Sequence, residues 1–238
     1  MSPPPIVHRG VASGGTFKGI RIHAAAGIHE HALDLLRRER GDRARVLEVG
    51  CGSGALTARL DDAGYDVVAS DVETSDYAAA PPVVTWNLDG SAIPEGFRES
   101  FDVVCAIEVL EHVENPLQAL RNVREVLRPG GLLIASTPHI GHPRSRIKFL
   151  VRGAPAFFGR EEYVISGHRT LLPDWLLARH LEAAGFTEIE LSYGGAYGLT
   201  GLSRLAYRVL VPAFAVLGMM PTPRDRDGSA VFARARRG

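Results

Sequence analysis

The sequence VLEVGCGSG, residues 46–54, decides the fold of this chain. The apolar run RVLEV (45–49) predicts a buried strand, and the glycine-rich turn after it leads into a predicted helix, ALTARLDDAG (55–64). A glycine turn between a strand and a helix allows the backbone to approach a ligand closely at the helix N-terminus. Glu48 stands inside the apolar strand, where a carboxylate is costly unless it finds partners. We therefore expect Glu48 to arrange the turn or its ligand.

Strands and helices alternate along the rest of the chain. Further strands are predicted at residues 65–71, 81–86, 101–107, 132–137, 186–193 and 229–235, and further helices at 23–39, 116–127 and 172–185. Asn115 followed by Pro116 is typical of the start of a helix. This alternation predicts an α/β fold in which helices cover both faces of a mostly parallel sheet.

Two long connections interrupt the alternation, at residues 138–168 and 194–227. We interpret them as insertions in a single domain, residues 45–238, which follows an N-terminal segment and lid helix, residues 1–44. A chain of 238 residues is long enough to give such a domain a substantial core.

Composition limits the setting and the partners of the protein. The 27 basic and 27 acidic residues balance, so no overall field favours nucleic acid or an anionic membrane. Two cysteines, Cys51 and Cys105, are too few for a disulfide framework. The start of the chain has no cationic segment followed by an apolar stretch, and no apolar run reaches the length of a membrane-spanning helix. We therefore expect a protein of the reducing cytoplasm.

A nicotinamide-dependent dehydrogenase is a rival interpretation of the glycine turn. Gly50, Gly52 and Ala55 fit the G-x-G-x-x-A form of the dinucleotide fingerprint, and Asp71 stands where a ribose-binding acid belongs. A short-chain dehydrogenase, however, requires Tyr-x-x-x-Lys, and neither lysine of the chain, at 18 or 148, has a tyrosine four positions before it. A two-domain dehydrogenase would need a second domain, for which the chain is too short. These features argue against hydride transfer.

A second polar motif, EVLEH at residues 108–112, follows the strand predicted at 101–107. If it turns as a helix, Glu108, Glu111 and His112 share one face, because positions i, i+3 and i+4 are neighbours there. That face could hold a metal ion, assist proton transfer, or be the solvated start of a helix. The residues alone leave these three interpretations open.

Several motifs together resemble one known family. VLEVGCGSG, Asp71 at the end of the second strand, FDVV followed by EVLEHVENP, LRPGG and LLIASTP occur in the order and spacing of the class I S-adenosylmethionine-dependent methyltransferases, across residues 45–193. The sequence is most similar to the ubiquinone-biosynthesis type of O-methyltransferase. The resemblance implies a Rossmann-like, doubly wound sheet of seven strands whose last strand is antiparallel. It also implies that S-adenosyl-L-methionine binds at the carboxyl ends of the central strands.

The same resemblance implies a set of cofactor-binding residues. Glu48 and the glycine turn would hold the methionine part and the ribose, and Asp71 would accept hydrogen bonds from both ribose hydroxyls. Asn87, where the family often has aspartate, and Leu88 would contact the adenine. The full implied set is Glu48, Gly50, Cys51, Gly52, Gly54, Asp71, Val72, Asn87, Leu88, Ile107 and Glu108.

The spacing E-x-x-E-H also resembles a divalent-metal site of small-RNA 2′-O-methyltransferases and of the ubiquinone type of enzyme. By this resemblance the metal ligands would be Glu108, Glu111, His112 and His168, a mixed oxygen and nitrogen set suited to Mg, Mn, Fe or Zn. A bound cation would lower the pKa of an acceptor hydroxyl and so help it attack the methyl group. Without a metal, His112 or His168 would be the preferred general base, and His139 lies on the same side of the predicted sheet.

The predicted insertions bear on the acceptor and the partners. We expect O-methylation of a small or lipidic acceptor that bears a hydroxyl, with N- or C-methylation and a non-catalytic cofactor-binding regulatory module as the alternatives. Residues 143–158 and 202–220 interleave cations with bulky apolar side chains, which suits either an active-site lid or peripheral contact with the inner face of a membrane. Nucleic acid is disfavoured, because these cations are few and mixed with aliphatic residues.

Overall fold

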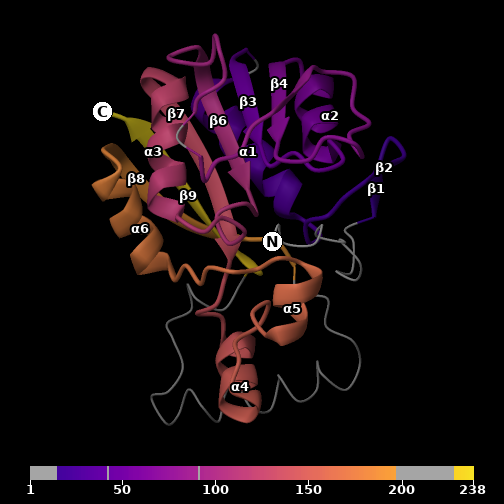
Figure 1. The fold of residues 1–238 in the computed structure, drawn as a ribbon, viewed down its shortest axis with the longest axis vertical. Helices are drawn as coiled ribbons and strands as arrows, with labels where there is room; N and C mark the ends of the chain where they lie inside the picture. Colours follow the sequence, from indigo (N-terminus) through magenta and orange to yellow (C-terminus); the bar gives the residue numbers. More distant parts are fainter. Residues whose placement is uncertain (1–14, 42, 91, 197–227) are drawn as a thin grey trace.

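A sheet of seven strands, in the order β5-β4-β3-β6-β7-β9-β8, forms the centre of the protein (Figure 1). The structure is a computed structural model, and it describes residues 15–41, 43–90, 92–196 and 228–238. The strands of this sheet are β3 (Arg45–Val49), β4 (Asp66–Asp71), β5 (Val83–Thr85), β6 (Phe101–Ile107), β7 (Leu127–Pro138), β8 (Phe186–Gly194) and β9 (Ala230–Arg237). Strands β3 to β7 pair in parallel, whereas β9 pairs antiparallel with both β7 and β8. The predicted α/β fold with an antiparallel last strand is confirmed.

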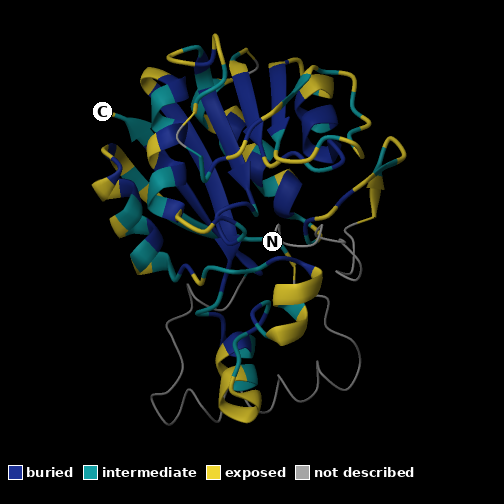
Figure 2. Cartoon of the chain, viewed as in Figure 1, coloured by how far each residue is buried: buried dark blue, intermediate teal, exposed yellow. Residues whose placement is uncertain are grey.

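Helices cover both faces of this sheet. They are α1 (Ile28–Arg40) and α2 (Ala55–Asp62) on one face and α3 (Pro116–Val126) and α6 (Asp174–Ala183) on the other. Neighbouring side chains of a strand point to opposite faces. Val46 therefore belongs to the core shared with α1 and α2, and Leu47 to the core shared with α3 and α6. Figure 2 shows the strands as a buried layer between helices whose outer surfaces are exposed.

Local backbone features set where the elements begin. The helix predicted from residue 23 begins at Ile28, because Gly27 adopts a left-handed conformation with a φ of 84°. Helix α3 starts as predicted: the side chain of Asn115 accepts a hydrogen bond from the N–H of Gln118 at 3.1 Å, and proline follows it. The predicted turn RPGG (128–131) is an irregularity within β7, where the pairing register with β6 shifts.

Residues 108–112 form a turn and not a helix, so the helical face considered from the sequence does not exist. Glu108 has a left-handed backbone conformation with a φ of 55°, so the chain leaves β6 sharply. The N–H of His112 donates to the carbonyl of Val109 at 2.9 Å, which closes the turn. The relative positions of the polar side chains therefore depend on this turn and on what packs against it.

The first predicted insertion projects from the carboxyl edge of the parallel strands. We call residues 139–168 the arm; it contains α4 (Pro143–Arg152) and α5 (Arg160–Ile165), which stand away from the sheet in Figure 1. Of the second predicted insertion, 194–227, the structure describes only residues 194–196, so the stretch 202–220 lies outside the described residues. No helix in the described part of the chain is long and apolar enough to cross a lipid bilayer.

The N-terminal segment, predicted as part of a lid, contains a hairpin beside α2. It consists of β1 (Thr16–Phe17) and β2 (Ile20–Arg21). The guanidinium of Arg59 in α2 lies 4.4 Å from the centre of the Phe17 ring, a cation–π contact. The Ser53 hydroxyl donates to the carbonyl of Arg21 at 2.6 Å. The hairpin thus packs against the glycine turn.

Candidate functional site

The glycine turn between β3 and α2 packs tightly against two other loops. Gly50 has a φ of 70°, and a Cβ atom there would lie 2.4 Å from Cγ2 of Val109. Only glycine fits both this backbone conformation and this contact. A Cβ at Gly54 would lie 2.8 Å from Cε2 of Tyr77. The glycines therefore bring the turn after β3, the turn after β6 and the loop around Tyr77 together.

Glu48 has the partner that its place in an apolar strand required. It is buried, and its carboxylate accepts a hydrogen bond from the hydroxyl of Thr57 in α2. Burial raises the pKa of Glu48 to about 8, although the Thr57 hydrogen bond acts in the opposite direction. A cationic ligand group would favour the ionised form. Glu48 thus joins the strand to the helix and can respond to a positively charged ligand.

Asp71 closes β4 beside the glycine turn. Its Oδ2 accepts a hydrogen bond from the N–H of Gly52 at 2.7 Å, and its backbone carbonyl accepts one from Trp86 at 2.8 Å. Because β3, β4, β5 and β6 are neighbours and parallel, their carboxyl ends lie along one edge of the sheet. This arrangement places a carboxylate between the glycine turn and the loop after β5.

The residues predicted to bind a cofactor all lie along this edge. They are Glu48, Gly50, Cys51, Gly52 and Gly54 in and after β3, Asp71 and Val72 at the end of β4, Asn87 and Leu88 after β5, and Ile107 and Glu108 at the end of β6. The side chain of Val72 is exposed and that of Leu88 is buried. The amide oxygen of Asn87 accepts from the N–H of Asp89 at 3.0 Å, so Asn87 also stabilises its own turn.

Glu111 lies at the centre of a second group of polar side chains. It is fully buried, and neither carboxylate oxygen has a hydrogen-bond partner among the described residues. Ligand atoms of Glu111, His112 and His168 all lie within 4.8 Å of one another. Burial, and then the charge of Glu108, raise the pKa of Glu111 well above its ordinary value. Its Oε1 lies 4.0 Å from Nε2 of His112, too far for a hydrogen bond, and the Thr137 hydroxyl offsets the rise in the pKa of Glu111 only in part. A buried carboxylate with such weak partners is costly, so the site fits an additional cationic ligand.

His168 is brought to this group from the end of the arm. Its Nδ1 lies 2.7 Å from the carbonyl oxygen of Phe157, which can only accept, so Nδ1 carries the proton and Nε2 the lone pair. The N–H groups of residues 169 and 170 both donate to the carbonyl of Glu111, at 2.8 and 3.0 Å. The Thr170 hydroxyl donates to the carbonyl of Val113 at 2.8 Å. These bonds fix the end of the arm on the turn that carries Glu111.

Glu108 and His139 lie outside the group of close ligand atoms. Glu108 is half-buried and accepts a hydrogen bond from Ser136, and burial raises its pKa to about 7. His139, predicted as a candidate base, is almost fully buried, with its ring 4.7 Å from that of Tyr193 and its Nδ1 3.2 Å from the carbonyl oxygen of Gly228. The structure therefore combines Glu111, His112 and His168, and places Glu108 beside them.

Sequence reasoning missed the hydroxyl residues that support the site. Thr57 binds Glu48, Ser136 binds Glu108, and Thr170 fixes the turn after β6. Ser136 falls within the motif LLIASTP, but nothing in that motif pairs it with Glu108. Such residues are ordinary in strands, helices and turns, so only their contacts reveal their roles.

A doubly wound sheet with a glycine turn after one central strand and an acid closing the next defines an α/β enzyme with a nucleoside cofactor at its strand ends. Residues 21–191 match the family model described as a methyltransferase domain. The chain therefore belongs to the methyltransferase-domain family. The predicted class, the S-adenosylmethionine-dependent methyltransferases, and the predicted cofactor are confirmed.

Curated relatives have a common name. The chain is 38% identical over 107 residues to the ubiquinone biosynthesis O-methyltransferase of Cereibacter sphaeroides, which covers 39% of this chain and 40% of that protein. It is 31% identical over 164 residues to the protein of the same name from a Ruegeria species, covering 61% of each. This chain thus aligns with less than two thirds of the length of either relative.

Solved structures share the fold. A S-adenosylmethionine-dependent methyltransferase from Archaeoglobus fulgidus is similar with a TM-score of 0.57 at 16% identity, over 87% of this chain and 94% of that one. Phosphoethanolamine N-methyltransferase 2 of Haemonchus contortus, solved with S-adenosyl-L-methionine, is similar with a TM-score of 0.58 at 15% identity, over 91% of this chain and 54% of that one.

Proposed function

We propose that this protein transfers the methyl group of S-adenosyl-L-methionine to a hydroxyl of a small or lipidic acceptor. The supporting observation is the group of the buried Glu111 and the half-buried His112 and His168 next to the cofactor edge of the sheet. A neutral hydroxyl is a poor nucleophile, and carboxylates and imidazoles are the groups that remove its proton. The name of the relatives from Cereibacter and Ruegeria supports the same reaction.

Each residue has a role that follows from its chemistry. The cofactor supplies an electrophilic methyl group, and Glu48 and Asp71 would hold its cationic and ribose parts. When no cation is bound, Nε2 of His168 carries the lone pair and would accept the proton of the acceptor hydroxyl. The carboxylate of Glu111 would stabilise the imidazolium that forms. Holding the two reactants in line supplies much of the acceleration.

We also propose that the same group holds a divalent cation. The buried carboxylate of Glu111 and two nearby imidazoles form a mixed set of ligands that fits such an ion. A bound cation would lower the pKa of the acceptor hydroxyl, and Nε2 of His168 would then be a ligand of the cation and not the base. Glu108 would support the site from beside it.

Metal removal tests this proposal. Calorimetry with Mn²⁺ should show binding to the wild type and a loss of affinity of about 100-fold in His168→Ala, because one ligand and its orientation are lost. Chelation should lower turnover by about 10-fold or more, and added Mn²⁺ should restore it. His180→Ala, on α6 and outside this group, is the control. Full turnover under complete chelation would exclude a catalytic metal.

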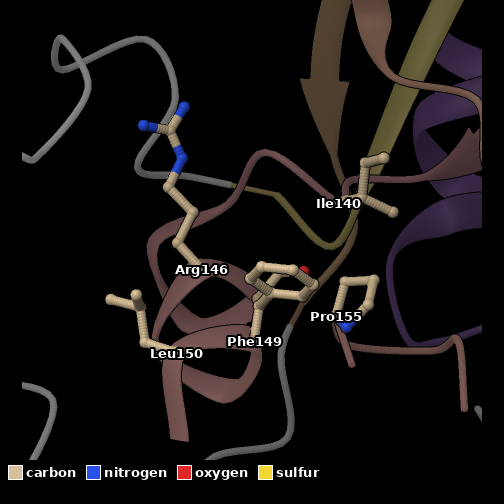
Figure 3. Close-up of a pocket in the computed structure, with 6 residues that line it drawn as sticks. Ile140, Arg146, Phe149, Leu150 and Pro155 are labelled. Atoms are coloured by element: carbon tan, nitrogen blue, oxygen red, sulfur yellow. The ribbon is translucent and has the colours of Figure 1, made fainter. Parts of the chain in front are cut away.

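A hollow in the arm supports a lipidic acceptor. Figure 3 shows Ile140, Phe149 and Pro155 around this space of about 350 Å³, with Arg146 and Leu150 from α4. Its lining is mostly apolar, which suits an acyl or prenyl chain. Pro155 is two positions from Phe157, whose carbonyl orients His168. A chain bound in the hollow would thus have its polar end near the candidate base.

The reaction is tested with purified protein and cofactor that carries an isotope-labelled methyl group. Incubation with a lipid extract, followed by mass spectrometry, should give labelled products whose methyl group is on oxygen, with stoichiometric formation of S-adenosylhomocysteine. If the labelled methyl group were found only on nitrogen or carbon, the reaction would be N- or C-methylation and not O-methylation. Cofactor binding without any turnover would favour a regulatory module.

We further propose that the arm contacts the membrane surface that contains such an acceptor. Three consecutive apolar side chains of α4, Phe149, Leu150 and Val151, are 54%, 62% and 76% exposed. The exposed residues of α4 and α5 lie at the end of the molecule away from the helices of the sheet (Figure 2). Helix α4 carries four cations and no acid. Apolar side chains among cations favour insertion into an anionic interface.

Sedimentation with vesicles tests this contact. Changing Leu150 and Val151 together to Glu should reduce the fraction bound to anionic vesicles at least about 10-fold, because each apolar side chain contributes about 1.5–3 kcal/mol when buried. Arg152→Glu should weaken binding to anionic vesicles by about 1 kcal/mol. It should leave binding to neutral vesicles unchanged. Arg121→Glu, an exposed cation on α3, is the matched control. Unchanged partitioning of the double variant would exclude the arm as a membrane contact.

A further inference from the structure

Ser136, near the end of β7, is fully buried and hydrogen-bonded twice to Glu108, the residue that follows β6. The N–H of Glu108 donates to Oγ of Ser136 at 3.0 Å, and that hydroxyl donates to Oε1 of Glu108 at 2.8 Å. Because a backbone N–H can only donate, the single hydroxyl proton is directed at the carboxylate. The hydroxyl therefore fixes the backbone and the side chain of Glu108 together.

Glu108 has two features that require such a partner. Its φ of 55° is unfavourable for a residue with a Cβ, so the turn needs a bond that holds it. It also stands at the start of the turn, residues 108–112, that carries the buried Glu111. The position of its carboxylate relative to Glu111 therefore depends on what holds this first residue of the turn.

We propose that Ser136 is a positioning residue, which holds Oε1 of Glu108 on the strand side so that Oε2 acts with Glu111 on a ligand of the site. The kinetic part of this inference rests on the proposed O-methylation, whereas the structural part does not. Ser136 itself touches no reacting atom in this arrangement. If the Ser136 hydroxyl only stabilised the pairing of β6 and β7, its removal would leave the carboxylate of Glu108 in place.

The structural test is the crystal structure of the full chain with Ser136→Ala. We expect the carboxylate of Glu108 to leave the position that it has in the wild type. Ser136→Cys keeps nearly the same volume with a weaker hydrogen bond, so it serves if the alanine variant fails to fold. An unmoved Glu108 carboxylate in the variant that folds would overturn the proposal.

The kinetic test is a double-mutant cycle in the labelled-methyl assay. Ser136→Ala should lower kcat about 10- to 100-fold, because small misplacements of a site residue have effects of this size. The affinity for S-adenosylhomocysteine should stay within about threefold. In a Glu108→Ala background, Ser136→Ala should cause no further loss, since the serine acts through Glu108. If the loss of kcat in the double variant were the product of the losses in the two single variants, the proposal would be overturned.

One matched control and one outcome separate this inference from the proposed function. Ser100→Ala likewise removes a serine hydroxyl, but this one donates to the backbone carbonyls of Gly96 and Arg98, away from the site. It should leave kcat unchanged. If the wild type methylates no acceptor, the proposed O-methylation fails, and the crystal structures still decide whether Ser136 positions Glu108.

Discussion

Glu111→Gln is expected to lower turnover by about 100-fold or more and to stabilise the cation-free protein. The loss follows from removing a carboxylate that assists proton transfer or binds a metal. The gain follows from replacing a fully buried carboxyl group, which is costly when it ionises, by a neutral amide. We expect a gain of about 1–3 kcal/mol in the free energy of unfolding. A substitution that lowers activity but raises stability is typical of a residue in a functional site.

The stability gain should depend on pH in a defined direction. The pKa of Glu111 in the folded protein is raised well above its ordinary value of 4.5, so the native state retains a proton that the unfolded state loses. Stability of the wild type should therefore fall as the pH rises from the unfolded value towards the folded one. The advantage of Glu111→Gln should be larger at about pH 8 than at about pH 5. Urea unfolding of the wild type and of Glu111→Gln at each of the two pH values, with a chelator present, measures this difference in stability.

Glu114→Gln is the control for this prediction. Glu114 lies in the same segment, but its side chain is 75% exposed and pairs with Arg169 at 3.2 Å. An exposed ion pair contributes about 0–1 kcal/mol, so this variant should be close to wild type in stability and turnover. Full turnover of Glu111→Gln, or a lower stability at every pH, would contradict the assignment of Glu111 to the site.

Asp71→Ala is expected to weaken the binding of S-adenosylhomocysteine by about 100-fold or more. Two ribose hydroxyls would lose their acceptor, and hydrogen bonds to a charged group contribute about 1.5–3 kcal/mol each. The N–H of Gly52 also loses its 2.7 Å bond to Oδ2, so the glycine turn is less well held. Asp71→Asn should have an intermediate effect, because its amide nitrogen cannot accept a hydrogen bond. Calorimetry measures the affinities directly.

The matched control is at the opposite end of the same strand. Asp66 begins β4, its side chain is 74% exposed, and it pairs with Arg45 at 3.6 Å. Asp66→Ala should leave the affinity for S-adenosylhomocysteine within about twofold, since surface substitutions of this kind are nearly neutral. If Asp71→Ala bound S-adenosylhomocysteine as tightly as wild type, the cofactor would not use this edge of the sheet as proposed.

Much of the fold was predictable because its signals are local. Apolar runs such as 45–49 and 101–107 predicted buried strands, and Asn115 with Pro116 predicted a helix start that the structure contains. The start of α1 was not predictable by periodicity, because the left-handed conformation of Gly27 delays the helix. Sequence patterns report side-chain spacing, whereas single φ values also depend on the packing around them.

Local sequence patterns were enough to predict the sheet, the glycine turn after β3 and the edge where Asp71 and the other predicted cofactor residues meet, because parallel strands present their carboxyl ends together. Tertiary structure alone decided that EVLEH is a turn, that His168 returns from the arm to Glu111, and that Ser136 binds Glu108. These contacts join segments far apart in the chain. Their geometry is set by packing between elements, which no local pattern of residues encodes.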